Sequence, residues 1–205
     1  MLSYFAQGGP FMWPLLVFSI ITAGVTVERL IYLLSHNLGM EDLEQEIEGF
    51  VRRGDPGGAK AYLEKTRRRP GAEVLEALVD SSGLSENRME KAAEAAALLV
   101  LDRLESGLAL LAAFGSLAPL TGFLGTVSGM ISAFRSLAQA AEVNPQTAAG
   151  GIYEALITTA FGLGIAIIAL AAQGIFSRIA DRFAGRTEKA CADLITAVLK
   201  AREKR

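Results

Sequence analysis

The stretch that decides the fold is Leu120–Phe134, LTGFLGTVSGMISAF. It lies in a run from Ser106 to Phe134 that contains no ionisable side chain. A transmembrane helix needs roughly 20 predominantly apolar residues, so this run predicts a helix that crosses a membrane. The run is nevertheless rich in glycine, threonine and serine. A helix that only faced lipid would have no need of such small and hydroxylated positions, so we ask what this helix packs against.

The composition of the whole chain also indicates a membrane protein. Of its 205 residues, 51% are hydrophobic and 20% are charged, and the mean hydropathy is +0.35. The apolar residues therefore have to be concentrated in blocks. The formal net charge is −2, and the basic residues form no stripe with interleaved aromatic side chains. This pattern argues against a nucleic-acid partner.

Three segments have the length and composition of membrane spans. The sequence therefore predicts an all-α integral membrane protein with extended helices. The expected organisation is an N-terminal segment with the first span (1–34), a helical cytoplasmic domain (35–106), a second span (107–134), a short periplasmic connection (135–153), a third span (154–177) and a C-terminal cytoplasmic helix (178–205). No basic residue precedes the first apolar block, so we interpret it as a retained span rather than a signal peptide.

Basic residues near the ends of the spans predict the orientation. No Lys or Arg precedes Arg29, which closes the first span, whereas several basic residues follow soon after the third span: Arg178, Arg182, Arg186 and Lys189. The positive-inside rule then places the N-terminus on the periplasmic side and the C-terminus in the cytoplasm. Arg29 itself is typical of a long side chain that reaches from the end of a span to the membrane surface.

The segment between the first two spans has the pattern of several short helices. Leu43 and Ile47 have the spacing of one helix face, and GDPGG at 54–58 interrupts that helix. Pro70 with Gly71 marks a second break. Ser85 is the expected N-cap of a longer helix that continues into the second span.

Both later spans carry seams of small residues. Lipid tails are as apolar as leucine, so helices in a membrane associate through close backbone approach and interhelical hydrogen bonds. One chain with three spans has few helices with which to cover these seams, and the pattern predicts a homo-oligomer. The packing positions are Gly122, Gly125 and Gly129 in the second span, where Gly125 to Gly129 is a GxxxG, and Gly162 in the third.

A carboxylate accompanies the hydroxyl groups of the third span. Glu154 begins that span, Thr158 follows about one turn later, and Thr159 lies beside it. An ionisable group in a membrane segment is costly and commonly marks a polar pathway. Glu154 is also near enough to the end of the span to reach the interface. The residues alone therefore leave both a polar pathway and simple helix packing open.

Three long stretches resemble a known family. They are GGPFMWPLLVFSIITAGVTVERLIYLL (Gly8–Leu34), LAPLTGFLGTVSGMISAF (Leu117–Phe134) and GGIYEALITTAFGLGIAI (Gly150–Ile167). They resemble the three spans of the ExbB/TolQ branch of the MotA/TolQ/ExbB proton channel family. The resemblance implies a homopentamer in the bacterial inner membrane, enclosing the single spans of a dimeric ExbD- or TolR-like partner. That complex would pass work from the proton-motive force to a TonB- or TolA-like protein.

The resemblance also implies roles for particular residues. Thr126, in GTVSG, falls on the pore-facing threonine of the family's second span, and Thr159, in ALITTAFG, falls on that of the third. Glu154, in YEAL, falls on the glutamate at the pore mouth. On a regular helix, however, Thr158 lies about 40° from Glu154 and Thr159 about 140°. Thr158 therefore stays a second candidate. The family often has a proline in the later half of the third span, where this chain has Ile168.

The expected function is that of the ring subunit of a proton-driven motor for TonB-dependent transport across the outer membrane. The alternatives are a TolQ-like subunit of the Tol-Pal envelope system and a passive membrane scaffold whose small residues only pack. No enzyme activity, metal or other cofactor is expected, because the only histidine and cysteine, His36 and Cys191, are far apart and lack a supporting motif. The interior of the spans contributes no group that titrates near neutral pH, so the resemblance assigns the proton-carrying Asp to the partner. Thr126 and Thr159 would receive it.

Overall fold

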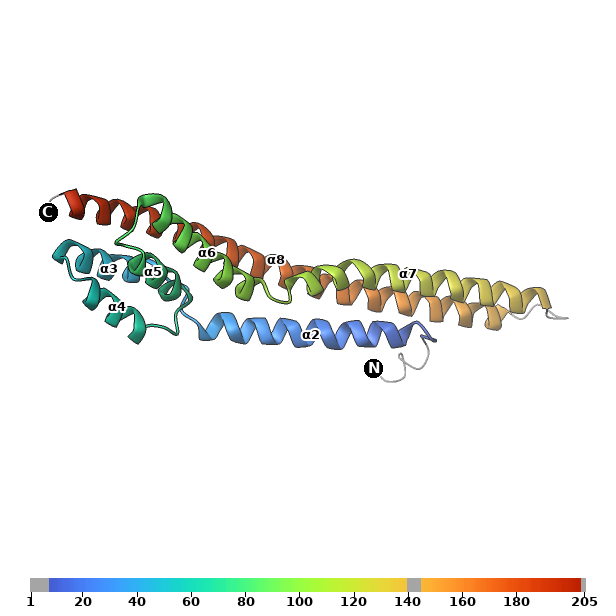
Figure 1. Cartoon of the computed structure of the whole chain (residues 1–205). Helices are drawn as coiled ribbons and strands as arrows, with labels where there is room; N and C mark the ends of the chain where they lie inside the picture. The colour runs from blue at the N-terminus through green and yellow to red at the C-terminus, as the bar shows by residue number, and fades with distance from the viewer. Residues whose placement is uncertain (1–7, 140–144, 204–205) are drawn as a thin grey trace. The chain divides into compact units, whose positions relative to one another are not determined.

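The computed structural model describes residues 8–139 and 145–203, which are almost entirely helical (Figure 1). No strand occurs among these residues. The all-α prediction is confirmed. The helices are α2 (Met12–Ser35), α3 (Glu41–Arg53), α4 (Pro56–Lys65), α5 (Pro70–Asp80), α6 (Glu86–Glu105), α7 (Leu108–Gln139) and α8 (Pro145–Glu203).

Three helical stretches of the described chain are long and apolar enough to cross a membrane, as the sequence predicts. They lie in Met12–Ser35, Glu86–Gln139 and Ala149–Glu203. The helices continue beyond the expected spans. α7 extends to Gln139 and α8 starts at Pro145, so most of the expected connection 135–153 is helical, while 140–144 lie outside the described residues. The third span and the C-terminal helix are one uninterrupted element, α8.

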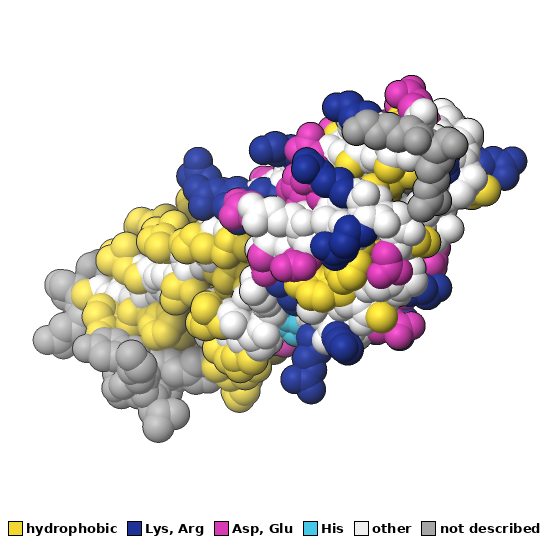
Figure 2. Space-filling model, turned by 90° about the vertical axis from the view of Figure 1, so that its left-hand side faces the viewer, with side chains coloured by type: hydrophobic (Ala, Val, Ile, Leu, Met, Phe, Trp, Pro, Cys, Tyr) yellow, Lys and Arg dark blue, Asp and Glu magenta, His cyan; other side chains and the backbone are white. Residues whose placement is uncertain are grey.

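The chain divides into two compact units. The apolar unit comprises residues 1–29 and 107–175, and the charged unit comprises residues 30–106 and 176–205. On the face shown in Figure 2, charged side chains of both signs gather in one region and apolar side chains in another. Within the described part of the apolar unit, the charged side chains are Glu28, Arg29, Arg135 and Glu154.

In the charged unit, local sequence signals set the helix ends. Gly54 ends α3 in the left-handed conformation, with φ of 69°, and Asp55 caps α4 by accepting the Gly58 N–H at 2.8 Å. α5 begins at Pro70, whose missing N–H costs nothing in a first turn. Both predicted breaks are confirmed. Ser85 precedes α6 with an extended backbone, although its hydroxyl makes no capping bond.

The expectation that α6 continues into the second span is wrong. α6 ends at Glu105, and α7 begins at Leu108. Gly107 between them has φ of 78°, a conformation that glycine adopts at little steric cost. A Cβ at Gly107 would also lie 2.9 Å from Val25 Cγ1 of α2. Apolar periodicity does not detect such a break, because Gly107 fits an apolar run equally well.

The core of the apolar unit is an antiparallel hairpin of α7 and α8, against which α2 packs. The buried positions repeat at alternating spacings of three and four residues, as in coiled-coil seams. They are Gly115, Ala118, Gly122 and Gly125 in α7, and Ala155, Thr158, Gly162, Ile165 and Ala169 in α8. From α2, Met12 and Leu15 join Ala118 and Ile165 in one apolar cluster. Phe18 of α2 also stacks on Phe114 of α7, with ring centroids 4.9 Å apart.

Candidate functional site

The backbones of α7 and α8 touch at Gly122 and Gly162. A Cβ on Gly122 would lie 2.7 Å from the Thr158 carbonyl oxygen and 3.0 Å from Thr159 Cα. A Cβ on Gly162 would lie 2.5 Å from the Ala118 carbonyl oxygen. These separations are shorter than van der Waals contact. The helices can approach this closely only because both positions lack a side chain.

The GxxxG of α7 is also covered within the chain. A Cβ on Gly125 would lie 2.8 Å from Thr158 Cβ, and one on Gly129 would lie 3.0 Å from Ala155 Cβ. α8 therefore occupies the glycine face of α7. The small-residue seam is filled by the chain's own hairpin, so it does not by itself require a second copy.

Two threonine hydroxyls meet at one backbone carbonyl. The hydroxyl oxygen of Thr158 lies 3.2 Å from the Gly122 carbonyl oxygen, and that of Thr159 lies 3.1 Å from the same atom. Thr158 has one hydroxyl hydrogen, and the Ala155 carbonyl, at 2.7 Å, is its nearer acceptor. In an α-helix the carbonyl of residue i accepts the N–H of residue i+4, which for Gly122 is that of Thr126. The Gly122 carbonyl thus lies beside the hydroxyls of Thr158 and Thr159, while Thr126 is related to it only through the helix backbone.

The three threonine side chains differ in exposure. Thr158 is only 1% exposed and lies inside the hairpin, whereas Thr126 and Thr159 are half-buried. The Thr126 hydroxyl donates to the Phe123 carbonyl, at 2.6 Å. Thr126 and Thr159 can therefore be reached from outside the α7–α8 contact, and Thr158 cannot. Helix periodicity alone could not distinguish Thr158 from Thr159, because the distinction depends on how α7 packs on α8.

Glu154 lies well inside α8, about one turn before Thr158, and is half-buried. The turn that leads into α2 is its neighbour. A Cβ on Gly9 would lie 3.1 Å from Glu154 Cδ and would overlap its Oε1. The sequence gives no sign of this contact between residues so far apart in the chain. It brings the start of α2 to the only acidic side chain in the described part of 107–175.

The two boundary arginines have different environments. Arg29 is 7% exposed and pairs with the neighbouring Glu28, with Nη2 and Oε1 2.5 Å apart. Its guanidinium is therefore covered in this chain rather than extended from it. Arg178 is exposed on α8, just beyond the apolar unit.

The charged unit holds several polar groups of structural character. Burial, with a smaller contribution from Glu44, raises the pKa of the Cys191 thiol to about 11. The Arg69 guanidinium lowers the pKa of Asp42 to about 2, and its Nη2 donates to Asp42 Oδ1 at 2.7 Å. His36 Nδ1 lies 2.9 Å from the Tyr32 carbonyl oxygen, one turn back. In the described part of the chain, no group of three or more His, Cys, Asp or Glu side chains could hold a metal ion.

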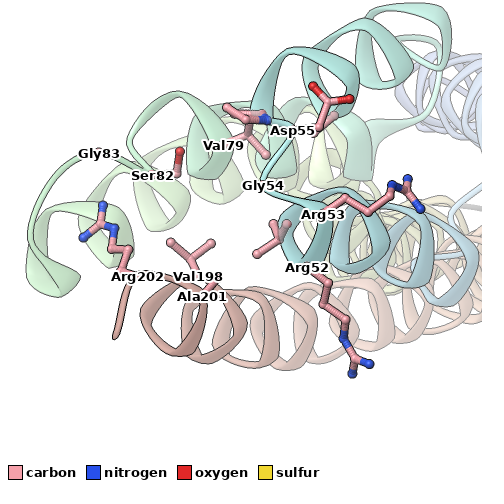
Figure 3. A pocket seen from close by; sticks show the side chains of 13 residues that line it. Arg52, Arg53, Gly54, Asp55, Val79, Ser82, Gly83, Val198, Ala201 and Arg202 are labelled. Atoms are coloured by element: carbon pink, nitrogen blue, oxygen red, sulfur yellow. The ribbon is translucent and has the colours of Figure 1, made fainter. Parts of the chain in front are cut away.

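A cavity of about 490 Å³ opens in the charged unit (Figure 3). Val79 and Val198 line it, while the side chains of Arg52 and Arg53 run outward from its rim. Both arginines already have contacts, since Arg52 pairs with Glu48 and Arg53 lies over the Phe50 ring. The cavity lies outside the unit that holds the candidate threonines, so it takes no part in the threonine site.

Known proteins similar to this chain include channel and transport components. Residues 64–189, which include all four candidate pathway residues, match the MotA/TolQ/ExbB proton channel family. The chain is 35% identical over 179 residues to the putative biopolymer transport protein ExbB-like 1 of Synechocystis sp., covering 83% of this chain and 68% of that protein. It is 30% identical over 193 residues to the biopolymer transport protein exbB1 of Vibrio cholerae, covering 89% of this chain and 81% of that protein.

A shorter match has higher identity. Over 85 residues the chain is 44% identical to the Tol-Pal system protein TolQ of Pseudomonas aeruginosa. That alignment covers 42% of this chain and only 37% of the Pseudomonas protein. The two biopolymer transport proteins thus match over most of their length, and TolQ over little more than a third.

Proposed function

The chain belongs to the MotA/TolQ/ExbB proton channel family, and from that premise we propose that it is the ring subunit of a proton-driven motor in the bacterial inner membrane. The family consists of channel and transport components and is not an enzyme family. In this proposal, copies of the chain form a pentamer around a dimeric, single-span ExbD-like partner. The complex then performs work on a TonB-like protein for transport across the outer membrane.

The ExbB-type assignment is supported by the extent of the alignments. The two alignments cover more than two thirds of each biopolymer transport protein. In this chain they extend over the charged unit as well as the hairpin. The TolQ alignment is local. A TolQ-like role in the Tol-Pal system is the alternative, because the two systems would use similar rings and differ in their partners.

The observation that carries the proposed mechanism is how the hydroxyls of Thr126 and Thr159 are held. Thr126 and Thr159 each direct their hydroxyl hydrogen to a backbone carbonyl. A hydroxyl that donates in this way still has lone pairs with which to accept a hydrogen bond. It is therefore ready to accept from a protonated carboxylic acid, which is a donor, but not to donate to a carboxylate, which only accepts. The two hydroxyls favour the protonated form of an acid placed beside them.

The size of this preference is modest. Interhelical hydrogen bonds in membranes contribute about 0.6 kcal/mol on average and up to about 1.7 kcal/mol. A protonated acid has one hydrogen to donate, so it bonds one of the two hydroxyls at a time. One such bond would favour the protonated acid by about 0.6–1.7 kcal/mol, a factor of roughly 3 to 20 in its protonation equilibrium. Such a bias is strong enough to couple protonation to the position of the partner's span and weak enough to reverse in each cycle.

Thr159 rather than Thr158 is the pore-facing threonine of α8 in this proposal. Thr158 is almost completely buried, and its hydroxyl is held by carbonyls of its own chain. Replacing Thr158 with valine should therefore weaken the hairpin slightly and leave partner-dependent proton flux largely unchanged. Glu154 then lies at the periplasmic mouth, with the N-terminus periplasmic and the charged unit cytoplasmic.

Native mass spectrometry of the detergent-purified protein tests the proposed assembly. The protein is measured alone and after co-expression with a candidate ExbD-like single-span partner. A pentamer that gains partner chains is the expected result. A monomer or dimer that ignores the partner in several mild detergents would overturn the ring. The passive-scaffold alternative differs in predicting that removal of the Thr126 and Thr159 hydroxyls has no effect on flux.

A further inference from the structure

The turn before α2 is built of two glycines that lie on α8. Gly8 is buried and Gly9 is half-buried. Gly9 has φ of 65°, a left-handed conformation that favours glycine. Its carbonyl accepts the Met12 N–H at 3.2 Å, which ties the turn to the start of α2.

Both glycines contact the same turn of α8. Gly9 lies against the Glu154 carboxylate, so that a Cβ on Gly9 would overlap Oε1 and lie 3.1 Å from Cδ. A Cβ on Gly8 would lie 3.4 Å from Ile157 Cγ2, which is three residues further along α8. Met12, just after the turn, is buried in the cluster with Leu15, Ala118 and Ile165. The turn is thus anchored at the carboxylate on one side and in the apolar core on the other.

We propose that Gly9 is a positioning residue for Glu154. The carboxylate occupies the place that a Cβ on Gly9 would take, so any other residue type would displace it. A glutamate side chain has several rotatable bonds, and the turn reduces the conformations open to it. This inference rests on the proposed function, because it gives Gly9 a purpose only if the place of Glu154 matters for proton flux.

The test is partner-dependent proton flux in proteoliposomes that contain the full chain and its ExbD-like partner. Gly9→Ala is expected to lower the flux at least fivefold, because the new methyl group displaces the carboxylate. Gly24→Ala is the matched control. It also adds one methyl group to the α2 region, but no atom lies within 4 Å of its Cβ position, so the flux should stay within a factor of two of wild type.

A second variant separates steric displacement from backbone strain. Asparagine tolerates the left-handed conformation better than alanine but still adds a Cβ. Gly9→Asn should therefore lower the flux as Gly9→Ala does. Normal flux in Gly9→Asn would overturn the proposal. Size-exclusion chromatography and thermal unfolding of each variant show whether the complex is still assembled.

A double-mutant cycle shows whether Gly9 acts through Glu154. Glu154→Ala removes the carboxylate that the new methyl group would displace. If Gly9 only positions Glu154, the double variant Gly9→Ala/Glu154→Ala has the same flux as Glu154→Ala alone. If the fold-loss of flux in the double variant equals the product of the fold-losses in the two single variants, the positioning role is overturned. An unchanged flux in Glu154→Ala would also overturn the positioning role, whereas no partner-dependent flux in wild type would overturn the proposed function.

Chemical modification of the carboxylate gives a readout that is independent of flux. The membrane-permeant reagent dicyclohexylcarbodiimide modifies carboxyl groups in apolar surroundings, and mass spectrometry of the peptide that contains Glu154 gives the rate. Displacement of the carboxylate in Gly9→Ala should change this rate at least threefold relative to wild type and Gly24→Ala. Equal rates in all three proteins would contradict the proposal.

Discussion

A single methyl group added at Gly162 should loosen the α7–α8 hairpin. Its Cβ would lie 2.5 Å from the Ala118 carbonyl oxygen and 3.3 Å from Gly122 Cα. Carbon and oxygen atoms normally stay above 3 Å apart, so the two backbones have to separate by several tenths of an ångström. That movement also lengthens the Thr159 hydroxyl contact with the Gly122 carbonyl, now 3.1 Å. Gly164, two residues further along α8, makes none of these contacts. No atom lies within 4 Å of its Cβ position.

The expected magnitude combines three effects. Overpacking of a well-packed contact typically costs about 1–3 kcal/mol, and the weakened threonine bond adds about 0.6 kcal/mol. Replacing glycine by alanine inside a helix returns up to about 1 kcal/mol. Gly162→Ala should therefore lower the free energy of unfolding by about 1–3 kcal/mol. Gly164→Ala should leave it unchanged or raise it by up to about 1 kcal/mol.

Unfolding in mixed micelles of mild detergent and dodecyl sulfate, followed by circular dichroism, measures this difference. All variants are compared at one protein concentration, because oligomerisation shifts apparent stability. Equal stability of Gly162→Ala and Gly164→Ala would refute the close backbone contact. A larger loss in Gly164→Ala would show that the packed face of α8 is a different one.

Three further predictions concern the charged unit. The Arg69 guanidinium lowers the pKa of Asp42 to about 2, so the pair stabilises the fold above the unfolded-state pKa near 3.9, and this contribution is lost as the pH falls through about 2. Because the Asp42 carboxylate is exposed, although Arg69 is mostly covered, Asp42→Asn should cost about 0.5–1 kcal/mol. Melting temperatures of variant and wild type should differ at pH 6 and converge toward pH 2. Cys191 is buried, and its pKa is raised to about 11. Iodoacetamide at pH 8 should therefore modify it roughly 100-fold more slowly in the folded protein than in denaturant. Similar rates in the two conditions, measured by mass spectrometry, would contradict its burial. Asp55→Ala removes the cap on the Gly58 N–H and should cost about 1 kcal/mol of stability in thermal melts, whereas Asp55→Asn should retain most of it.

Local sequence signals predicted the helix ends of the charged unit well. The breaks at Gly54 and Pro70 follow from the local conformational preferences of these residues. Gly54 is a left-handed glycine that ends a helix, and Pro70 stands at a first helical position. The break at Gly107 was missed for the opposite reason. It depends on a positive φ and on Val25 of another helix, neither of which an apolar run reveals.

The register of the hairpin was only partly predictable. A four-residue spacing in the sequence predicts that Gly122 and Thr126 share one helix face. It presents Gly125 and Gly129 as a separate GxxxG motif. In the structure, α8 packs along a seam with an average spacing of 3.5 residues, so Gly122 and Gly125 contact the same residue, Thr158. The contact of Gly9 with Glu154 was beyond any periodicity argument, because it joins segments far apart in the chain.

The central claim is that Thr126 and Thr159 present hydroxyls to an acid supplied by a partner. Partner-dependent proton flux of Thr126→Val/Thr159→Val in proteoliposomes tests it most directly. Thr196→Val is the matched control, because Thr196 is exposed on the charged-unit part of α8 and its hydroxyl bonds the Ala192 carbonyl at 3.0 Å. We expect the double variant to assemble with the partner and lose at least threefold in flux, while Thr196→Val keeps it. Normal flux in an assembled double variant would contradict the claim.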